Sequence, residues 1–210
     1  MRHNPAMDAP TADTAARSLA RRDPVIAEML KRHGPPALQR DLGSHFAALA
    51  RSICFQQLAG RAATTIHGRF LALVDGTPTP EKVLVLTGED MRAAGLSANK
   101  AASIRDLATK CVDGTVELDR LSALGDDVII NELTTVRGIG VWTAQMFLMF
   151  QLGHLDVWPV LDLGVRSGFA RLYGHDAPLS SAQMQQEGER FTPYRSIVAW
   201  YCWRAVDATT

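Results

Sequence analysis

Residues 133–169 read LTTVRGIGVWTAQMFLMFQLGHLDVWPVLDLGVRSGF. An amphipathic helical run leads to Arg137, a tight Gly138-Ile139-Gly140 turn follows, and a second helix is expected to begin at Val141. One face of this second helix carries residues at i, i+4 and i+7, namely Trp142, Met146 and Met149. The pattern predicts two helices joined by a short hairpin over about residues 128–150.

The glycine turn has two interpretations. Gly138 and Gly140 allow positive φ angles and the close approach of another chain. The amides of Gly140, Val141 and Trp142 would then be unpaired donors at a helix start, a suitable place for a nucleic-acid phosphate. An ordinary connection between two helices is the alternative, which a Gly-x-Gly motif alone favours.

A carboxylate follows the hairpin. Asp162 precedes a helix predicted over residues 163–173, which Gly174 ends. Aspartate is a preferred N-cap, so these residues alone favour a structural role. A helix start also suits an ionised carboxylate, the form that can stabilise a cationic sugar during hydrolysis. Asp156 is the nearest competitor, but its place before Trp158 and Pro159 suits a structural turn.

The rest of the chain also reads as helical. A helix capped by Asp23 and begun by Pro24 is expected to end at His33. Further helices are predicted at about residues 44–54, 59–73, 80–86, 89–94, 99–112, 119–124, 126–135, 181–189 and 194–206. No alternating β pattern is sustained, which predicts an all-α fold. Residues 1–20 lack an apolar period and are expected to form a disordered tail before a single domain over residues 21–207.

Composition limits the classes of protein. Hydrophobic residues make up 47% and charged residues 21%, as in a globular chain. With 22 basic and 22 acidic residues the net charge is zero, which argues against binding nucleic acid by bulk charge, although a local basic face remains open. Three scattered cysteines, Cys54, Cys111 and Cys202, exclude a four-cysteine iron–sulfur site and fit a reducing compartment. Without a membrane-length apolar run or a signal core, a cytosolic protein away from membranes is expected.

Four segments together resemble a known family. They are SICFQQL at 52–58, GLSANKAASIRDLA at 95–108, the Gly-Ile-Gly hairpin, and PYRSIVAWYCW at 193–203. In this order, over about residues 22–206, they resemble the 3-methyladenine DNA glycosylase II family of the helix-hairpin-helix DNA glycosylase superfamily, in a compact form without the extra N-terminal domain. The resemblance implies two helical lobes flanking a cleft that is lined by the hairpin and a catalytic aspartate.

The resemblance also implies roles for individual residues. Asp162 matches the catalytic aspartate. Trp142 stands where bifunctional members carry a nucleophilic lysine, so base release without strand cleavage is expected. The substrate-base pocket would be formed by Trp142, Met146, Trp203 and Phe55. Cationic methylated bases are attracted to electron-rich rings, while ordinary core packing is the alternative for each aromatic residue.

DNA contacts are implied at a further set of positions: Gln57, Leu58, Gly138, Gly140, Val141, Lys100 and Arg137. Gln57 or Leu58 would fill the gap that a flipped nucleotide leaves. Lys100 and Arg137 would contact phosphates or remain solvated surface charges. In relatives the hairpin holds Na⁺ or K⁺ through backbone carbonyls, which match Thr134, Val136 and Ile139. No organic cofactor is expected, and Arg195 is expected to brace the last helix.

The sequence therefore predicts a monofunctional DNA glycosylase that removes alkylated bases such as 3-methyladenine and 7-methylguanine. Its partner would be double-stranded DNA, bound by a monomer. The alternatives are a non-catalytic helix-hairpin-helix module and a glycosylase acting mainly on 1-methyladenine, 3-methylcytosine or other adducts. A small-molecule enzyme is unsupported, because no metal triad, phosphate loop or Ser/His/Asp set is visible.

Overall fold

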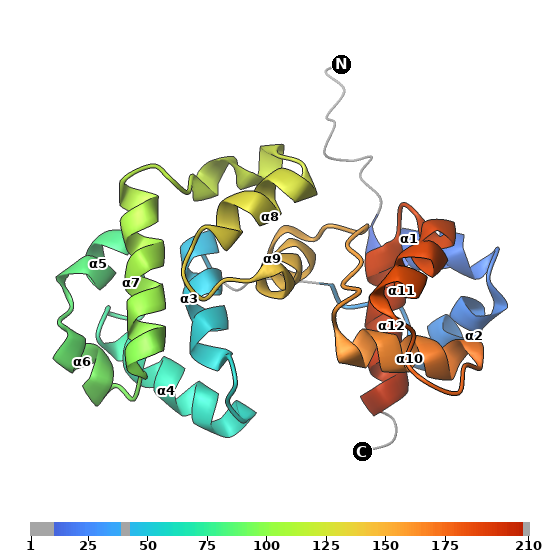
Figure 1. Ribbon diagram of the computed structural model, residues 1–210, viewed down its shortest axis with the longest axis horizontal. Helices are drawn as coiled ribbons and strands as arrows, with labels where there is room; N and C mark the ends of the chain where they lie inside the picture. The colour runs from blue at the N-terminus through green and yellow to red at the C-terminus, as the bar shows by residue number, and fades with distance from the viewer. Residues whose placement is uncertain (1–10, 39–42, 208–210) are drawn as a thin grey trace. The chain divides into compact units, whose positions relative to one another are not determined.

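The computed structural model describes residues 11–38 and 43–207 of the chain. Within these ranges the regular structure is entirely helical, which confirms the predicted all-α class. The chain divides into two compact units, one formed by residues 1–39 and 153–210 and the other by residues 40–152 (Figure 1). We call them the terminal unit and the central unit. In the described part, no helix has both the length and the apolar character needed to cross a membrane.

The terminal unit forms because the two ends of the chain pack together. Helices α1 and α2 both contact α12, so the N-terminal segment joins the C-terminal one. The intervening residues build a core of their own.

The central unit contains seven α-helices and two irregular helices in its described part. They are α3 (His45–Phe55), α4 (Gly60–Ala72), α5 (Pro80–Val85), α6 (Gly88–Ala93), α7 (Ala98–Val112), the 3-10 helix η2 (Leu118–Ala123), α8 (Asp126–Thr134), α9 (Val141–Phe147) and the π-helical turn η3 (Leu148–Leu152). Helix α3 lies at the centre of the unit and contacts α4, α7 and α9. Its predicted inner face is buried as expected, at Phe46, Leu49, Ala50 and Ile53.

The terminal unit is built around the contact between α10 and α12. Its helices are α1 (Ala12–Ala20), α2 (Pro24–His33), α10 (Leu163–Tyr173), α11 (Ser181–Gly188), the 3-10 helix η4 (Glu189–Phe191) and α12 (Arg195–Asp207). Phe169 of α10 stacks on Tyr173 and meets Phe191 edge to face, so aromatic rings fill this core. The buried Tyr201 hydroxyl donates to the carbonyl of Gly34, which ties α12 to the end of α2.

Local signals placed most helix ends correctly. The Asp23 carboxylate caps α2 by accepting from the amides of Val25 and Ile26, and Pro24 opens that helix as predicted. Ser97 caps α7 through the amide of Lys100. Gly174 ends α10 with a left-handed φ of 74°, a conformation that glycine adopts without a steric penalty.

Helix α1 corrects the prediction of a disordered tail over residues 1–20. Thr11 caps it, and Asp13 pairs with Arg17 one turn later. Ala15, Ala16 and Leu19 form a narrow buried stripe against α2 and α12. Small side chains make a weak apolar pattern, yet alanine favours helix and allows close packing. Residues 1–10 of the predicted tail lie outside the described residues.

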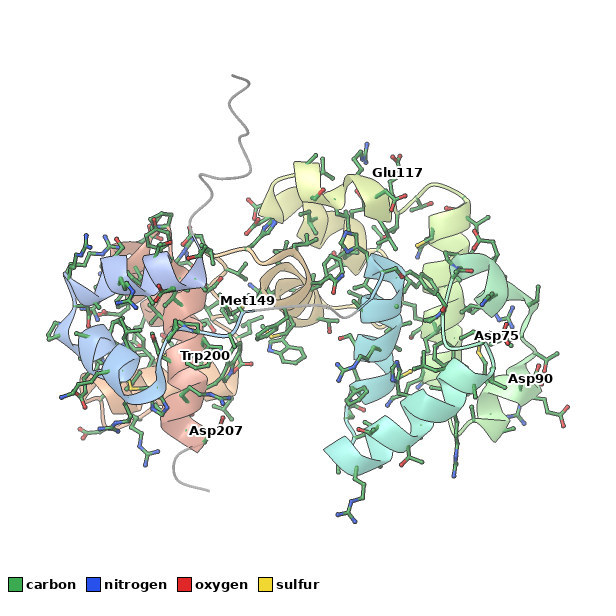
Figure 2. The ribbon with its side chains drawn as sticks, turned by 180° about the vertical axis from the view of Figure 1, so that it is seen from behind. Asp75, Asp90, Glu117, Met149, Trp200 and Asp207 are labelled. Carbon is green, nitrogen blue, oxygen red and sulfur yellow. The ribbon has the colours of Figure 1, made fainter. Side chains whose placement is uncertain are left out.

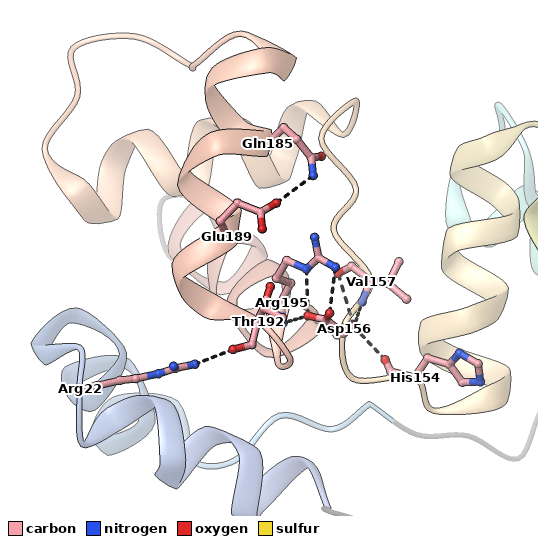
Figure 3. A network of polar contacts seen from close by, with 9 residues as sticks. Arg22, His154, Asp156, Val157, Gln185, Glu189, Thr192 and Arg195 are labelled. Carbon is pink, nitrogen blue, oxygen red and sulfur yellow. Dashed lines mark hydrogen bonds and ion pairs between the residues drawn. The ribbon is translucent and has the colours of Figure 1, made fainter. Parts of the chain in front are cut away.

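The segment before α10 is fixed to α12 by one ion pair. Arg195 donates from Nε to Asp156 Oδ1 at 2.9 Å and from Nη2 to Oδ2 at 2.8 Å (Figure 3). Beside it, the Ser196 hydroxyl donates to the carbonyl of His154 and accepts from the amide of Val157. The bidentate ion pair between Arg195 and Asp156 confirms the structural roles predicted for both residues.

Candidate functional site

The hairpin turn lies between α8 and α9 in the central unit. Helix α8 ends at Thr134 and not at Arg137, because the amides of Thr135 and Val136 turn back to the carbonyls of Glu132 and Leu133. Gly138 has a φ of 77°, and a Cβ there would lie 2.5 Å from the hydroxyl of Ser103. Any larger residue would therefore be both strained and crowded at this position.

Gly140 does not use the positive φ that a glycine allows. It is the N-cap of α9, with an extended φ of −96°, and a Cβ there would meet nothing within 4 Å. No side chain caps α9. The space over Gly140 is thus open to a ligand, as the prediction of a phosphate site at Gly140 and Val141 requires.

Asp106 of α7 fixes the hairpin turn in place. Its Oδ2 accepts from the backbone amide of Arg137 at 2.7 Å and from Lys110 Nζ at 2.8 Å. Burial alone would raise the pKa of Asp106, but the hydrogen bonds from Lys110 and the Arg137 amide outweigh it and hold the pKa below its usual value. The Arg137 guanidinium donates to Asn99 Oδ1 at 3.2 Å and stays exposed at the surface, where a phosphate could reach it.

Lys100, a predicted phosphate contact, makes a hydrogen bond within the protein. Its ammonium donates to the carbonyl of Cys54 at 2.7 Å, in the last turn of α3. Partial burial lowers the pKa of Lys100. A cation at a helix C-terminus satisfies carbonyls that lack helical partners, which explains why this lysine turns inward. The phosphate contact predicted for Lys100 stays a prediction.

Gln57 and Leu58, the residues predicted to fill the gap left by a flipped nucleotide, follow the C-cap of α3. We call these two residues the wedge. Gln57 has a left-handed φ of 55°, a conformation that costs a residue other than glycine about 1–2 kcal/mol. Its side chain is exposed, and Leu58 is 38% exposed. Gln56, by contrast, is half-buried and donates from Nε2 to the carbonyl of Gly138 at 2.8 Å. The sequence predicted a DNA contact for Gln57 and no role for Gln56.

The predicted pocket residues Trp142 and Met146 differ in exposure from each other and from Met149, which was predicted to share their helix face. Trp142 is 45% exposed, Met146 is half-buried, and Met149 is buried on η3 (Figure 2). Trp142 and Met146 belong to α9, whereas Met149 belongs to the π turn that follows it, where the regular helical spacing changes. Phe55 packs edge to face against His67, and the guanidinium carbon of Arg51 lies 4.2 Å from its ring centroid.

The Asp162 carboxylate caps α10 in the terminal unit. Its Oδ1 accepts from the amide of Val165 at 2.8 Å and from Trp203 Nε1 at 3.1 Å. Leu161 and Leu163 on either side are 63% and 66% exposed. A cap, an indole donor and two apolar neighbours thus surround this carboxylate.

Trp203 is distinct among the three large aromatic residues of α12. Tyr201 is buried, and Trp200 meets it edge to face while Arg204 lies over the Trp200 ring (Figure 2). Trp203 is half-buried and points its indole N–H at Asp162. Both residues were predicted to be functional, but the hydrogen bond between them was not predicted. Gly164 permits it, because a Cβ there would lie 3.0 Å from Trp203 Cδ1.

The predicted cation ligands lie in the hairpin turn. Among the backbone hydrogen bonds of the described residues outside helices, none is accepted by the carbonyls of Thr134 and Ile139, while the carbonyl of Val136 accepts from the amide of Ile139 at 3.1 Å. Carbonyl oxygens with spare lone pairs are suitable ligands for a hard monovalent cation. The cation site at these three carbonyls stays a prediction.

Comparisons with known proteins agree with this geometry. Residues 50–193 match the family described as HhH-GPD superfamily base excision DNA repair protein. DNA-3-methyladenine glycosylase 1 of Schizosaccharomyces pombe is 35% identical over 167 residues, which cover 76% of this chain and 71% of that protein.

Two solved structures are also similar. A 3-methyladenine DNA glycosylase of S. pombe in complex with abasic DNA has a TM-score of 0.79 and 31% identity, covering 90% of this chain and 95% of that one. A DNA-3-methyladenine glycosidase of Bacillus halodurans has a TM-score of 0.83 and 30% identity, covering 97% and 92%.

Proposed function

This chain belongs to the HhH-GPD superfamily of base excision DNA repair proteins, and from that premise we propose that it is a monofunctional DNA glycosylase for alkylated bases. It hydrolyses the N-glycosidic bond of 3-methyladenine, 7-methylguanine and similar bases in double-stranded DNA. The observation that carries the proposal is the Asp162 carboxylate held by the indole of Trp203 at the start of α10. The names of the similar proteins support the same substrate class.

Asp162 assists departure of the base by stabilising positive charge on the sugar. As the N-glycosidic bond breaks, the base takes the bonding electron pair and the sugar becomes oxocarbenium-like. The carboxylate stabilises this charge and orients a water molecule, which adds to C1′ and releases a proton. Trp203 Nε1 fixes Oδ1, so the orientation of the carboxylate is set before the substrate arrives.

A cationic base needs little help to leave. N3-methyladenine and N7-methylguanine carry a positive charge that is neutralised when the bond breaks, so no general acid is required. The exposed ring of Trp142 and the half-buried ring of Trp203 can each offer a π face to such a base. This attraction is worth about 0.5–2 kcal/mol and favours cationic lesions over neutral bases.

The central unit supplies the DNA contacts in this proposal. The open space over Gly140 and the uncapped start of α9 suit a backbone phosphate, and the exposed Gln57 and Leu58 suit the gap left by an extruded nucleotide. One copy of the chain carries every group invoked here, so we propose that a monomer acts.

Release of free bases from methylated duplex DNA tests this function. We expect 3-methyladenine to be released while the strand stays intact until alkali is added, because tryptophan at position 142 cannot attack the sugar as a lysine would. Nicking without alkali would contradict the monofunctional assignment. No release, with DNA binding intact, would favour a non-catalytic module. Release confined to 1-methyladenine or 3-methylcytosine would support the other glycosylase class.

We also propose that Na⁺ or K⁺ binds the carbonyls of Thr134, Val136 and Ile139, where it would add positive charge beside a bound phosphate. Replacing K⁺ by tetramethylammonium at constant ionic strength should then weaken DNA binding several-fold, because the larger cation cannot fit among the carbonyls. A filter-binding titration on duplex DNA measures the change. Equal affinity in the two salts would contradict the cation site.

A further inference from the structure

The adjacent residues Gln56 and Gln57 are placed in opposite ways. Gln57 is exposed and has a left-handed φ of 55°. Gln56 is half-buried. Its backbone amide continues the last turn of α3 by donating to the carbonyl of Ser52. The side chain of Gln56 therefore points back into the central unit at the position where the chain leaves α3.

The side-chain amide of Gln56 reaches the hairpin. Nε2 donates to the carbonyl of Gly138 at 2.8 Å and lies 3.5 Å from the hydroxyl of Thr143. Gly138 is in the turn, and Thr143 is a buried residue of α9. One side chain thus connects the residue before the exposed segment to both parts of the hairpin.

A second contact holds the end of α3 from the other side. Lys100, in the first turn of α7, donates to the carbonyl of Cys54. Ser103 of the same helix lies against Gly138. The end of α3, the start of α7 and the hairpin turn therefore meet at one junction, and Gln57 and Leu58 project from it.

We propose that Gln56 is a positioning residue that fixes the Gln57–Leu58 wedge in register with the phosphate-binding hairpin. The unfavourable φ of Gln57 persists because the residues before it are held by these contacts. With Gln56 in place, a hairpin that is bound to the DNA backbone holds the wedge at a defined base step. The inference rests on the proposed glycosylase function and assigns a task that the chemistry at Asp162 does not perform.

Loss of the Gln56 contact should slow base release from some substrates more than from others. A wedge is needed most when the lesion is paired, because extrusion then costs most, and least when the lesion is mispaired. Gln56→Met keeps the length of the side chain and removes the donor. The Gln56 contact lies near the surface, so water can hydrate the carbonyl of Gly138 and the fold should be retained.

Single-turnover base release compares Gln56→Met with the unaltered protein on two duplexes. One carries the methylated base opposite its normal partner and the other carries it opposite a mismatched base. We expect about a 10-fold slower release from the paired lesion and less than a 3-fold change for the mispaired one. Gln185→Met is the matched control, because exposed Gln185 of α11 donates a hydrogen bond to exposed Glu189 of η4 (Figure 3). An equal loss on both duplexes, or no loss on either, would overturn the proposal.

A second readout needs no turnover. The fluorescence of 2-aminopurine beside an abasic-site analogue reports how far a wedge unstacks its neighbours. We expect the signal change on binding to fall at least 3-fold in Gln56→Met while DNA affinity changes less than 3-fold. An unchanged signal would refute the positioning role even if the protein released no base. If the proposed chemistry were wrong, the unaltered protein would instead release no base while its fluorescence change on binding DNA stayed larger than that of Gln56→Met.

Discussion

Asp162→Asn should slow base release by about 10²–10³-fold, the usual effect of removing one preorganised electrostatic group from a transition state. Asparagine retains an Oδ1 that can accept from the amide of Val165 and from Trp203 Nε1, so α10 keeps its cap. Only the negative charge is lost. Single-turnover release of 3-methyladenine measures the rate, and thermal unfolding should show little change in stability.

This substitution separates two roles that the sequence could not. If Asp162 were only an N-cap, asparagine would replace it without loss of activity, because both residues are good caps. Unaltered release would therefore reject the catalytic role. Asp176→Asn is the matched control, because it removes an exposed carboxylate from the same unit shortly after α10 and should leave release unchanged.

The sequence predicted best those features that neighbouring residues decide. Asp23 with Pro24, Ser97 and Gly174 each determine a helix end through contacts within a few residues, and the structure confirms them. The family pattern extended this to Asp162 and Trp203, which lie far apart in sequence and within hydrogen-bonding distance in the fold.

Features that depend on distant partners were predicted less well. Lys100 was predicted as a phosphate contact or a solvated surface charge. The direction of its side chain depends on the carbonyl of Cys54 in another helix. Ala15 and Ala16 have no strong apolar signal, and only α2 and α12 give them something to pack against. No role was predicted for Gln56, because its partner, the carbonyl of Gly138, lies far away in the sequence.

Gly168 is another residue whose importance appears only in the fold. It lies within α10, where the intrinsic preference for helix makes alanine better than glycine by about 1 kcal/mol. Here, however, a Cβ would lie 2.0 Å from the carbonyl oxygen of Cys202 and 2.7 Å from its Cα. These are backbone atoms of α12, which cannot move aside by rotating a side chain.

Gly168→Ala should therefore destabilise the protein, by about 2–4 kcal/mol once the clash is set against the gain in helix preference. For a chain of this length, that lowers the midpoint of thermal unfolding by roughly 5–15 °C. Base release should fall as well, because Trp203 follows Cys202 directly and any shift of α12 moves its indole away from Asp162. Calorimetry and the single-turnover assay measure the two effects.

Gly88→Ala is the control that isolates the clash. Gly88 is the first residue of α6, and a Cβ there would meet nothing within 4 Å. Alanine at that position should change stability by less than about 1 kcal/mol, with a gain as the favoured sign, because it only restricts the unfolded chain. If Gly168→Ala behaved like Gly88→Ala, α10 and α12 could not approach as closely as the fold requires, and the alignment of Trp203 with Asp162 would need another explanation.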